Sequence, residues 1–269
     1  MGRAVAAQMT PDGPARATIA LMYHALGVFT VEHPGADPHY AIDPPRFERQ
    51  LALCARLHGA VVSARDWLAG APGIIFTFDD GHETNHRVAF PLLRAAGAGA
   101  DFFVNPAQVG GAGFASWSDL REMAEAGLSI QSHGLDHRYY LTSLSPARLR
   151  EELRRARLET EDHVGRPVTL LVPPGGRAPR DLQQAAREVG YTHVLGSRPA
   201  AIARGARGTL GRFAVTAGLG PEAFESLVRG GRARRMAQAR YATLGLAKRL
   251  LGDDRYAALR RRLLGTAPA

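Results

Sequence analysis

The sequence predicts an α/β fold, a distorted barrel of alternating strands and helices, and three observations indicate it. Short apolar runs alternate with helix-like segments over short connections, which is typical of βαβ units and a parallel sheet. About eight runs qualify as strands, which favours a closed or nearly closed barrel over an open sheet. A length of 269 residues with 45% hydrophobic residues suits one large domain with a full core.

In the first half of the chain, strands are expected at residues 17–22, 60–62 and 74–78. Asp43 precedes two prolines and opens a helix to about residue 58, because proline is tolerated in the first helical turn. Ser63 caps a turn of helix around Trp67. A third helix is expected over residues 85–96, with Gly97 just past its end.

In the second half, strands are expected at residues 100–104, 128–132, 168–172, 192–195 and 209–215. Helices are expected at residues 118–126, 145–164 and 179–189. Ser118 is the expected cap of the first of these helices, and Gly127 ends it. The second helix begins at a Ser-Pro pair and stops at Gly165.

The strand at residues 74–78 ends at two adjacent carboxylates, Asp79 and Asp80, followed by Gly81. The glycine relieves backbone strain where the chain turns, so both carboxylates can reach one cavity. Two carboxylates this close cannot both stay ionised without a compensating positive charge. A metal cation is the obvious candidate.

His133 and His137 are four residues apart, which places both imidazoles on one side of a helical turn. With a carboxylate from Asp79 or Asp80, they make a set of two histidines and one aspartate that leaves positions open for water and substrate. Alone, an Asp-Asp pair reads as a solvated turn and such histidines as surface or core residues. Together, at expected strand ends, they indicate a catalytic site.

Two of these segments resemble motifs of the polysaccharide deacetylases, also called the NodB-homology domain or carbohydrate esterase family four. Thr77–Gly81 matches the first motif, and His133–His137 matches the spacing of the second, with Gly134 in the Ser/Thr position. Leu21–His24 is similar to the exopolysaccharide-type branch. The resemblance spans about residues 17–228 and implies a distorted (β/α) barrel of the NodB type with a short C-terminal helical appendage.

The resemblance also implies roles. Asp79 would be the general base, and Asp80, His133 and His137 would hold a divalent metal ion, zinc, with cobalt or nickel as alternatives. Such an ion would polarise the acetyl carbonyl and lower the pKa of a bound water. The backbone N–H of Gly175 would donate to the oxyanion.

Two features depart from the family. Val172 stands where many members have the arginine that tethers the base, and the later Leu-x-His motif that supplies the general acid is absent. His24, at the end of the first strand, is the first candidate for the acid, followed by His193 and His82. Each of these histidines also reads as a structural residue.

Candidate substrate contacts are side chains near these motifs that could stack on or line a sugar site, although each also reads as packing: Trp117, Tyr139, Tyr140, Pro173 and Pro174. The implied reaction is metal-dependent removal of an N-acetyl group from an amino sugar, in an exopolysaccharide, cell-wall or lipid-linked glycan pathway. One alternative is an amidase acting on a formyl sugar, cyclic imide or ureide. Another is an inactive domain that binds glycan or a synthase, although such a domain needs no general base.

The chain divides into a flexible N-terminus (1–16), a deacetylase-like catalytic domain (17–228) and a basic helical extension (229–269). The extension has eleven basic and two acidic residues and so carries the whole net charge of +9. A terminal helical hairpin packed on the barrel is one reading of it, and peripheral contact with an anionic membrane is the other. No nucleic-acid motif accompanies the charge.

No secretory signal or membrane span is visible, which predicts a cytoplasmic location, peripheral at the inner face of the membrane. The single cysteine, Cys54, excludes an internal disulfide. The oligomeric state does not follow from the sequence.

Overall fold

The structure is a computed structural model, and it describes residues 17–243 except 30, 32, 138–140, 142 and 177. Eight strands form one sheet: β1 (Ala20–Tyr23), β2 (Val61–Val62), β3 (Ile74–Phe78), β4 (Asp101–Val104), β5 (Ser129–Ser132), β6 (Leu170–Leu171), β7 (His193–Val194) and β8 (Phe213–Ala214). The helices are α1 (Pro44–His58), α2 (Ala64–Leu68), α3 (Phe90–Ala95), α4 (Trp117–Glu125), α5 (Pro146–Val164), α6 (Leu182–Glu188) and α7 (Pro221–Val228). A π-helical turn, η1 (Asn85–Ala89), leads into α3, and a 3-10 turn, η3 (Pro174–Gly176), follows β6.

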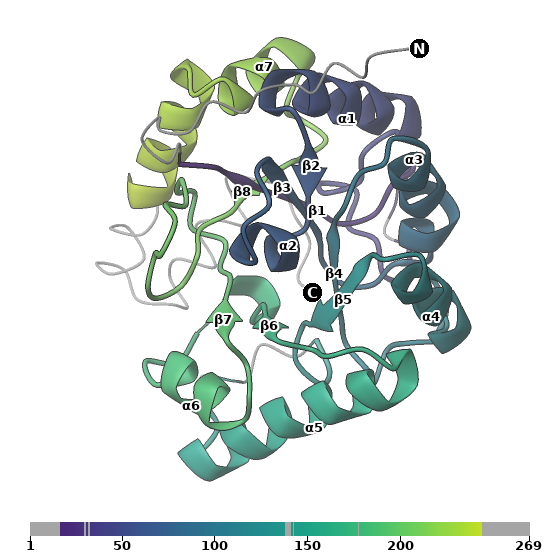
Figure 1. The fold of residues 1–269 in the computed structure, drawn as a ribbon, viewed down its shortest axis with the longest axis vertical. Coiled ribbons are helices and arrows are strands. Elements are labelled where there is room, and N and C mark those ends of the chain that lie inside the picture. Colours follow the sequence, from purple (N-terminus) through teal and green to yellow (C-terminus); the bar gives the residue numbers. More distant parts are fainter. Residues whose placement is uncertain are drawn as a thin grey trace, which may run out of the picture.

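All strand pairs are parallel, in the order β7-β6-β5-β4-β3-β1-β8, and β2 pairs with the first residues of β3. The sheet curls, and α1, α3, α4, α5 and α6 surround it (Figure 1). A parallel bridge between Leu195, just after β7, and Leu210, ahead of β8, links the two edges of the curled sheet. The predicted distorted (β/α) barrel is therefore confirmed.

The period-2 alternation of strand side chains divides the core into two layers. Leu21 of β1, Phe76 of β3 and Phe102 of β4 face the helices and join the larger apolar cluster. Their neighbours Ile75 and Phe103 point into the barrel, where they join a second buried cluster. The barrel interior is therefore a packed core and not a channel.

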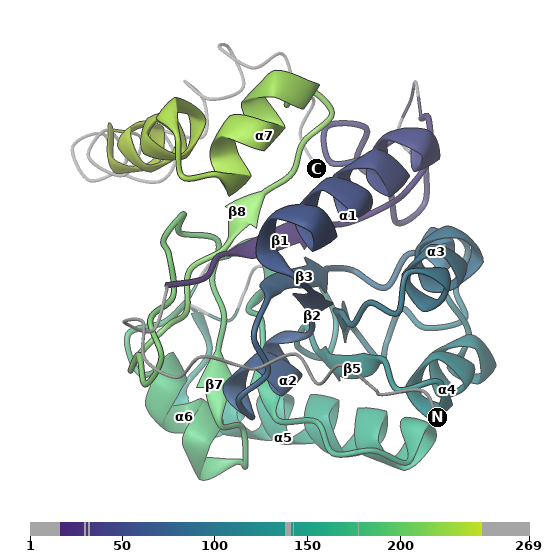
Figure 2. The same ribbon diagram turned by 45° about the horizontal axis from the view of Figure 1, so that its top comes forward.

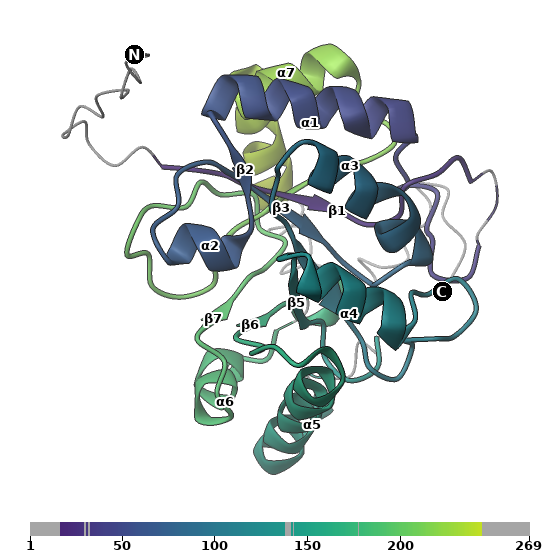
Figure 3. The same ribbon diagram turned by 45° about the vertical axis from the view of Figure 1, so that its right-hand side comes forward.

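The two ends of the barrel differ. Trp67 of α2 is buried in the inner cluster, so α2 covers the end where the strands begin. Figure 3 shows α2 at one end of the strands and the β1–α1 loop at the other. The strands therefore lead their C-terminal residues toward the end that carries the loops, where chemistry is expected in such folds.

Several local expectations were wrong in detail. The helix expected over 85–96 starts with the π-helical turn η1. The cap of α4 is Ser116 and not Ser118, because Ser116 and Asp119 form a reciprocal capping box. Most strands are shorter than their apolar runs. Helix α7, which begins after Gly220, was not predicted.

Helix α7 lies beside α1 (Figure 2), and Phe224 and Leu227 of α7 are part of the larger core cluster. Residues 232–243 continue as helix. Residues 1–16 and 244–269, where the flexible N-terminus and most of the basic extension were predicted, lie outside the described residues. None of the described helices is long and apolar enough to cross a bilayer.

Candidate active site

Asp79 and Asp80 diverge at the end of β3 because of the backbone. Asp79 follows the inward alternation of β3, and only 3% of it is exposed. Asp80 has a φ of 72° and is the only described non-glycine residue with positive φ; Gly81 has the same φ. A left-handed conformation costs an L-residue on the order of 1–3 kcal/mol and is typically kept where function needs it. Here it turns the Asp80 carboxylate away from the barrel interior.

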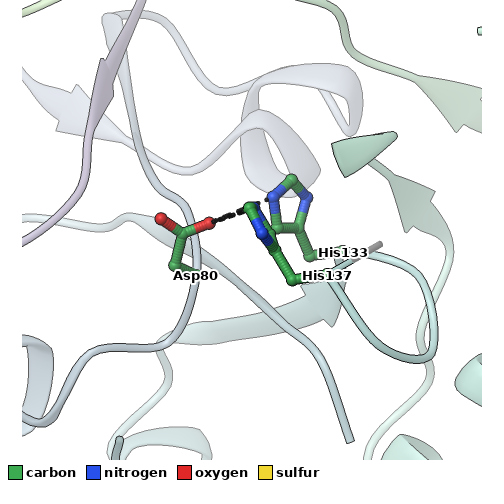
Figure 4. A group of neighbouring side chains, drawn as sticks. All are labelled: Asp80, His133 and His137. Atoms are coloured by element: carbon green, nitrogen blue, oxygen red, sulfur yellow. Dashed lines mark ion pairs between the residues drawn. The ribbon is translucent and has the colours of Figure 1, made fainter. Parts of the chain in front are cut away.

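Asp80, His133 and His137 come together as predicted. The Nε2 atoms of His133 and His137 lie 3.2 and 3.1 Å from Oδ1 of Asp80 (Figure 4). One ligand atom from each residue lies within 4.8 Å of the others, and no second group of this kind occurs among the described residues. The histidines follow β5, so three side chains from two strand ends converge.

The surroundings of the histidines fit a metal-ion site. Nδ1 of His133 lies 2.9 Å from the carbonyl oxygen of Val172, to which it can only donate, so Nε2 is the nitrogen that faces Asp80 and is available as a ligand. Asn105 donates from Nδ2 to the backbone carbonyl of His133. Such outer contacts fix the tautomer and ring orientation of a ligating histidine. Two imidazole nitrogens and one carboxylate oxygen suit zinc, cobalt or nickel.

The triad is also electrostatically paired. Burial acts to raise the pKa of Asp80, but hydrogen bonds with His133 and His137 hold this pKa well below its usual value. Burial likewise acts to lower the pKa of His137, yet the hydrogen bond and charge of Asp80 raise it overall. Asp80 is therefore ionised and available as an anionic ligand.

Arg212, just before β8, completes the site and was missed by sequence reasoning. Its guanidinium donates to both carboxylate oxygens of Asp79, at 2.7 and 2.8 Å, and to Oγ1 of Thr77 at 3.1 Å. It is fully buried in the barrel and lies 5.6 Å from the ring centroid of Phe103. An arginine inside an apolar run expected to be a strand was the available signal.

The arginine determines the charge state of the base candidate. Burial acts to raise the pKa of Asp79, but the charge and hydrogen bonds of Arg212 lower it below its ordinary value. Asp79 is therefore a carboxylate near neutral pH. The tether that Val172 cannot supply thus comes from a different strand.

His24 faces the second carboxylate oxygen of Asp80, Oδ2, whereas His133 and His137 contact Oδ1. Its Nε2 is 4.0 Å from Oδ2 of Asp80, and its ring stacks on Tyr40 with centroids 4.4 Å apart. Burial lowers the pKa of His24, and the charges of Asp80 and Asp79 oppose that effect. Its Nδ1 is buried and has no hydrogen-bond partner among the described residues.

The proline-glycine turn after β6 lies next to the loop 133–137, which carries the two histidines of the triad. Gly175, in η3, has a φ of 60°, and a Cβ on Gly134 would lie 3.5 Å from the ring of Pro174. The oxyanion role of the Gly175 N–H and the substrate contacts of Pro173 and Pro174 stay predictions.

The other candidates are placed as follows. Trp117 stacks on His163 of α5, with ring centroids 4.2 Å apart, at the α4–α5 contact. Tyr139 and Tyr140 lie outside the described residues. His193 begins β7, at the strand end opposite to the site. His82 is buried beside Thr84, with its Nδ1 2.8 Å from the Thr84 hydroxyl.

Comparison with known proteins gives a family model and a curated relative. Residues 69–194 match the family model described as "Polysaccharide deacetylase". YxkH of Bacillus subtilis (strain 168), provisionally named a polysaccharide deacetylase, is 28% identical over 156 residues, which are 58% of this chain and 56% of YxkH. The match thus spans little more than half of that relative's length.

Solved structures agree on the fold. IcaB from Ammonifex degensii superposes with a TM-score of 0.65 and 25% identity, over 84% of this chain and 98% of IcaB. The deacetylase PplD from Streptococcus pyogenes, in complex with acetate, gives a TM-score of 0.69 and 22% identity, over 77% and 96%.

Proposed function

The chain carries a polysaccharide deacetylase domain, and from this we propose that it is a metal-dependent hydrolase that removes the N-acetyl group from an amino sugar. The observation that carries the proposal is the juxtaposition of two differently paired carboxylates. Asp80 faces two imidazole nitrogens, whereas Asp79 is held by Arg212. One carboxylate is thus arranged to hold a cation and the other to accept a proton.

The metal would be held by Asp80, His133 and His137, and when bound it supplies a Lewis acid for the acyl carbonyl and acidifies water. Asp79 accepts the proton of the attacking water, because Arg212 fixes its carboxylate while leaving lone pairs free. The Gly175 N–H donates to the oxyanion that forms on the carbonyl. His24 donates a proton to the leaving amine nitrogen.

An amide is favoured over an ester because of His24. An amine leaves readily only after protonation, so an amide hydrolase needs a general acid on the leaving-group side. His24 lies beside Asp80, with its Nε2 4.0 Å from Oδ2, and so places an imidazole next to the triad for this role. That PplD is described as a deacetylase in complex with acetate supports acetate as the released acid.

The proposed substrate belongs to an exopolysaccharide, cell-wall or lipid-linked glycan pathway. A panel of N-acetylated, N-formylated, cyclic-imide and ureide compounds, assayed for released amine with zinc-, cobalt- or nickel-loaded protein, tests this. We expect turnover of N-acetylhexosamine oligomers. Turnover confined to imides or ureides would identify a different amidase, and metal-loaded protein that cleaves none of the panel would indicate an inactive binding domain.

Asp79→Asn is the matched test of the base within the same assay. The neutral amide keeps the shape of the carboxylate but accepts a proton poorly, so turnover should fall by roughly 10²–10⁴-fold. Metal content should stay that of the wild type, because Asp79 is not a ligand. Full turnover by this variant would contradict the assignment of the base.

We further propose that the basic extension binds an anionic membrane peripherally, at the cytoplasmic face. The described helix over residues 232–243 has Arg232, Arg234, Arg235 and Arg240 and no acidic residue. Met236 and Tyr241 of this helix are 57% and 46% exposed. Each basic residue near an anionic surface adds ~1 kcal/mol to binding. Such contact would hold the site near a lipid-linked sugar or a membrane synthase.

Co-sedimentation with anionic and with neutral vesicles, at low and high salt, tests the membrane contact. The double variant Arg235→Glu/Arg240→Glu should lose binding to anionic vesicles. The same charge change on α5, Arg148→Glu/Arg155→Glu, is the matched control and should keep it. Equal sedimentation of all three proteins, insensitive to salt, would leave the extension a purely structural element.

A further inference from the structure

We propose that Asn85, together with Thr84, is a positioning residue that holds His24 against the metal site. The inference rests on the proposed function, because it assigns His24 as the general acid. It does not require Asn85 to touch substrate. Two hydrogen bonds carry it, which join the turn after Gly81 to the backbone carbonyl of His24 and to the N–H of Leu26.

Both contacts reach the chain directly after the Cα of His24. Nδ2 of Asn85 donates to the backbone carbonyl of His24 at 2.8 Å. The backbone N–H of Leu26 donates to the hydroxyl of Thr84 at 2.9 Å. His24 itself leaves β1 and has no side-chain hydrogen bond at Nδ1 among the described residues. Its ring is therefore directed by its backbone and by the stack on Tyr40.

The rest of the β1–α1 loop closes on itself near the same point. Ile42 N–H donates to the carbonyl of Ala25, and Gly27 N–H donates to the carbonyl of Ile42. These bonds join the two arms of the loop to each other. The bonds from Asn85 and Thr84 join the loop to the turn that follows β3 and begins with Asp80.

Asn85 is placed by an unusual backbone. It begins the π-helical turn η1, and the N–H of Phe90 caps this turn on the Asn85 carbonyl. π-helical turns are rare and are found frequently at functional sites. The side chain is 1% exposed, and its Oδ1 has no partner among the described residues. A buried acceptor without a partner costs free energy, and the fold tolerates this cost while keeping the bond that Nδ2 donates to His24.

The hydrogen bond from Asn85 links the proposed acid, His24, to the segment that carries the proposed metal ligand, Asp80. Asn85 lies five residues after Asp80, the proposed metal ligand. Its side chain fixes the backbone carbonyl of His24, and the Nε2 of His24 lies 4.0 Å from Asp80. The β1–β3 pairing, in which the Asp79 N–H donates to the Tyr23 carbonyl, sets the approximate spacing of acid and metal site, and this turn adds a second link that fixes the peptide after His24. A shift of about 1 Å in such a pair can cost on the order of 10²-fold in rate.

A double-mutant cycle on amide turnover tests the positioning role. His24→Ala should lower kcat by roughly 10²–10⁴-fold and Asn85→Ala by roughly 10–100-fold, with metal content unchanged in both. In the His24→Ala background, Asn85→Ala should change kcat by less than about 2-fold, because its effect passes through His24. Multiplicative effects of the two changes would overturn the inference.

Thr84 offers the conservative comparison. Thr84→Ser keeps the hydroxyl that accepts from Leu26 N–H and should retain most of the activity. Thr84→Val has the shape of threonine but no acceptor, and its kcat should fall while KM is little changed. Loss of activity in both, or in neither, would contradict a role through that hydrogen bond.

Hydrogen exchange separates this inference from the proposed function. In the full-length protein, backbone amides of residues 24–27 should exchange faster in Asn85→Ala and Thr84→Val than in the wild type or Thr84→Ser. Unchanged exchange in all four proteins would overturn the inference, whether or not the protein hydrolyses amides. Faster exchange in Asn85→Ala and Thr84→Val, together with a wild type that cleaves no amide, would support the positioning of the His24 backbone and reject only the proposed reaction.

Discussion

Replacing His133 with alanine is expected to abolish metal binding and amide hydrolysis together. Wild-type protein should bind about one equivalent of a divalent ion, held by three protein ligands with room for water and substrate. His133 is 2% exposed and is oriented by the carbonyl of Val172, and its loss leaves Asp80 and His137 as the two remaining ligands of the triad. Metal content after dialysis, measured by mass spectrometry, should fall from about one equivalent to background.

His163→Ala is the matched control for that variant. It also removes an imidazole, but from the stack with Trp117 at the α4–α5 contact, and it should keep the metal. If the wild type, reconstituted with zinc, cobalt or nickel, binds none of them, the assignment of the triad is wrong. The same holds if His133→Ala retains a full equivalent.

Arg212→Met is expected to have the largest combined effect on stability and activity. It leaves the buried carboxylate of Asp79 without its countercharge, and breaking a buried pair in this way costs ~3–5 kcal/mol of the free energy of unfolding. Turnover should fall by roughly 10²–10⁴-fold, because the base loses its orientation. Urea unfolding and kcat measured on the same preparation give both quantities.

The stability loss should depend on pH with a defined sign. In the wild type, Arg212 holds the pKa of Asp79 below its ordinary value, so the stabilisation is present above the ordinary aspartate pKa and is lost as the pH falls. The gap between wild type and Arg212→Met should therefore narrow on acidification. A second variant, Asp79→Asn/Arg212→Met, removes both charges and should recover most of the stability but none of the activity. Wild-type turnover in Arg212→Met would refute the tether.

The sequence was sufficient for those parts of the site that are local in the chain. Asp79 and Asp80 are adjacent, and His133 and His137 are four residues apart, so spacing predicts their convergence at strand ends. The expected helical turn was wrong, because residues 133–137 form an irregular bend after β5. The tether could not be found this way. Arg212 is 133 residues from Asp79, and their contact depends on the inward alternation of β3 and on the pairing of β1 between β3 and β8.

For the same reason, Val172 suggested that Asp79 has no arginine partner, whereas Arg212 pairs with Asp79 from another strand end. The positive φ of Asp80 and the π-helical turn at Asn85 were also invisible, because neither residue type signals such backbone conformations in advance. Helix and strand order, by contrast, followed from apolar runs and from Gly and Pro positions. The barrel was therefore predictable, whereas the long-range polar contacts inside it were not.

Metal dependence is best tested by titrating a divalent ion into chelator-stripped protein and following amine release from an N-acetylhexosamine oligomer. We expect no turnover without metal, and a rate that rises linearly to a plateau at about one equivalent. Asp79→Asn should bind the ion along the same titration and release almost no amine. Full turnover by the stripped protein, or no turnover at saturation with zinc, cobalt or nickel, would contradict the proposed metal-dependent hydrolysis.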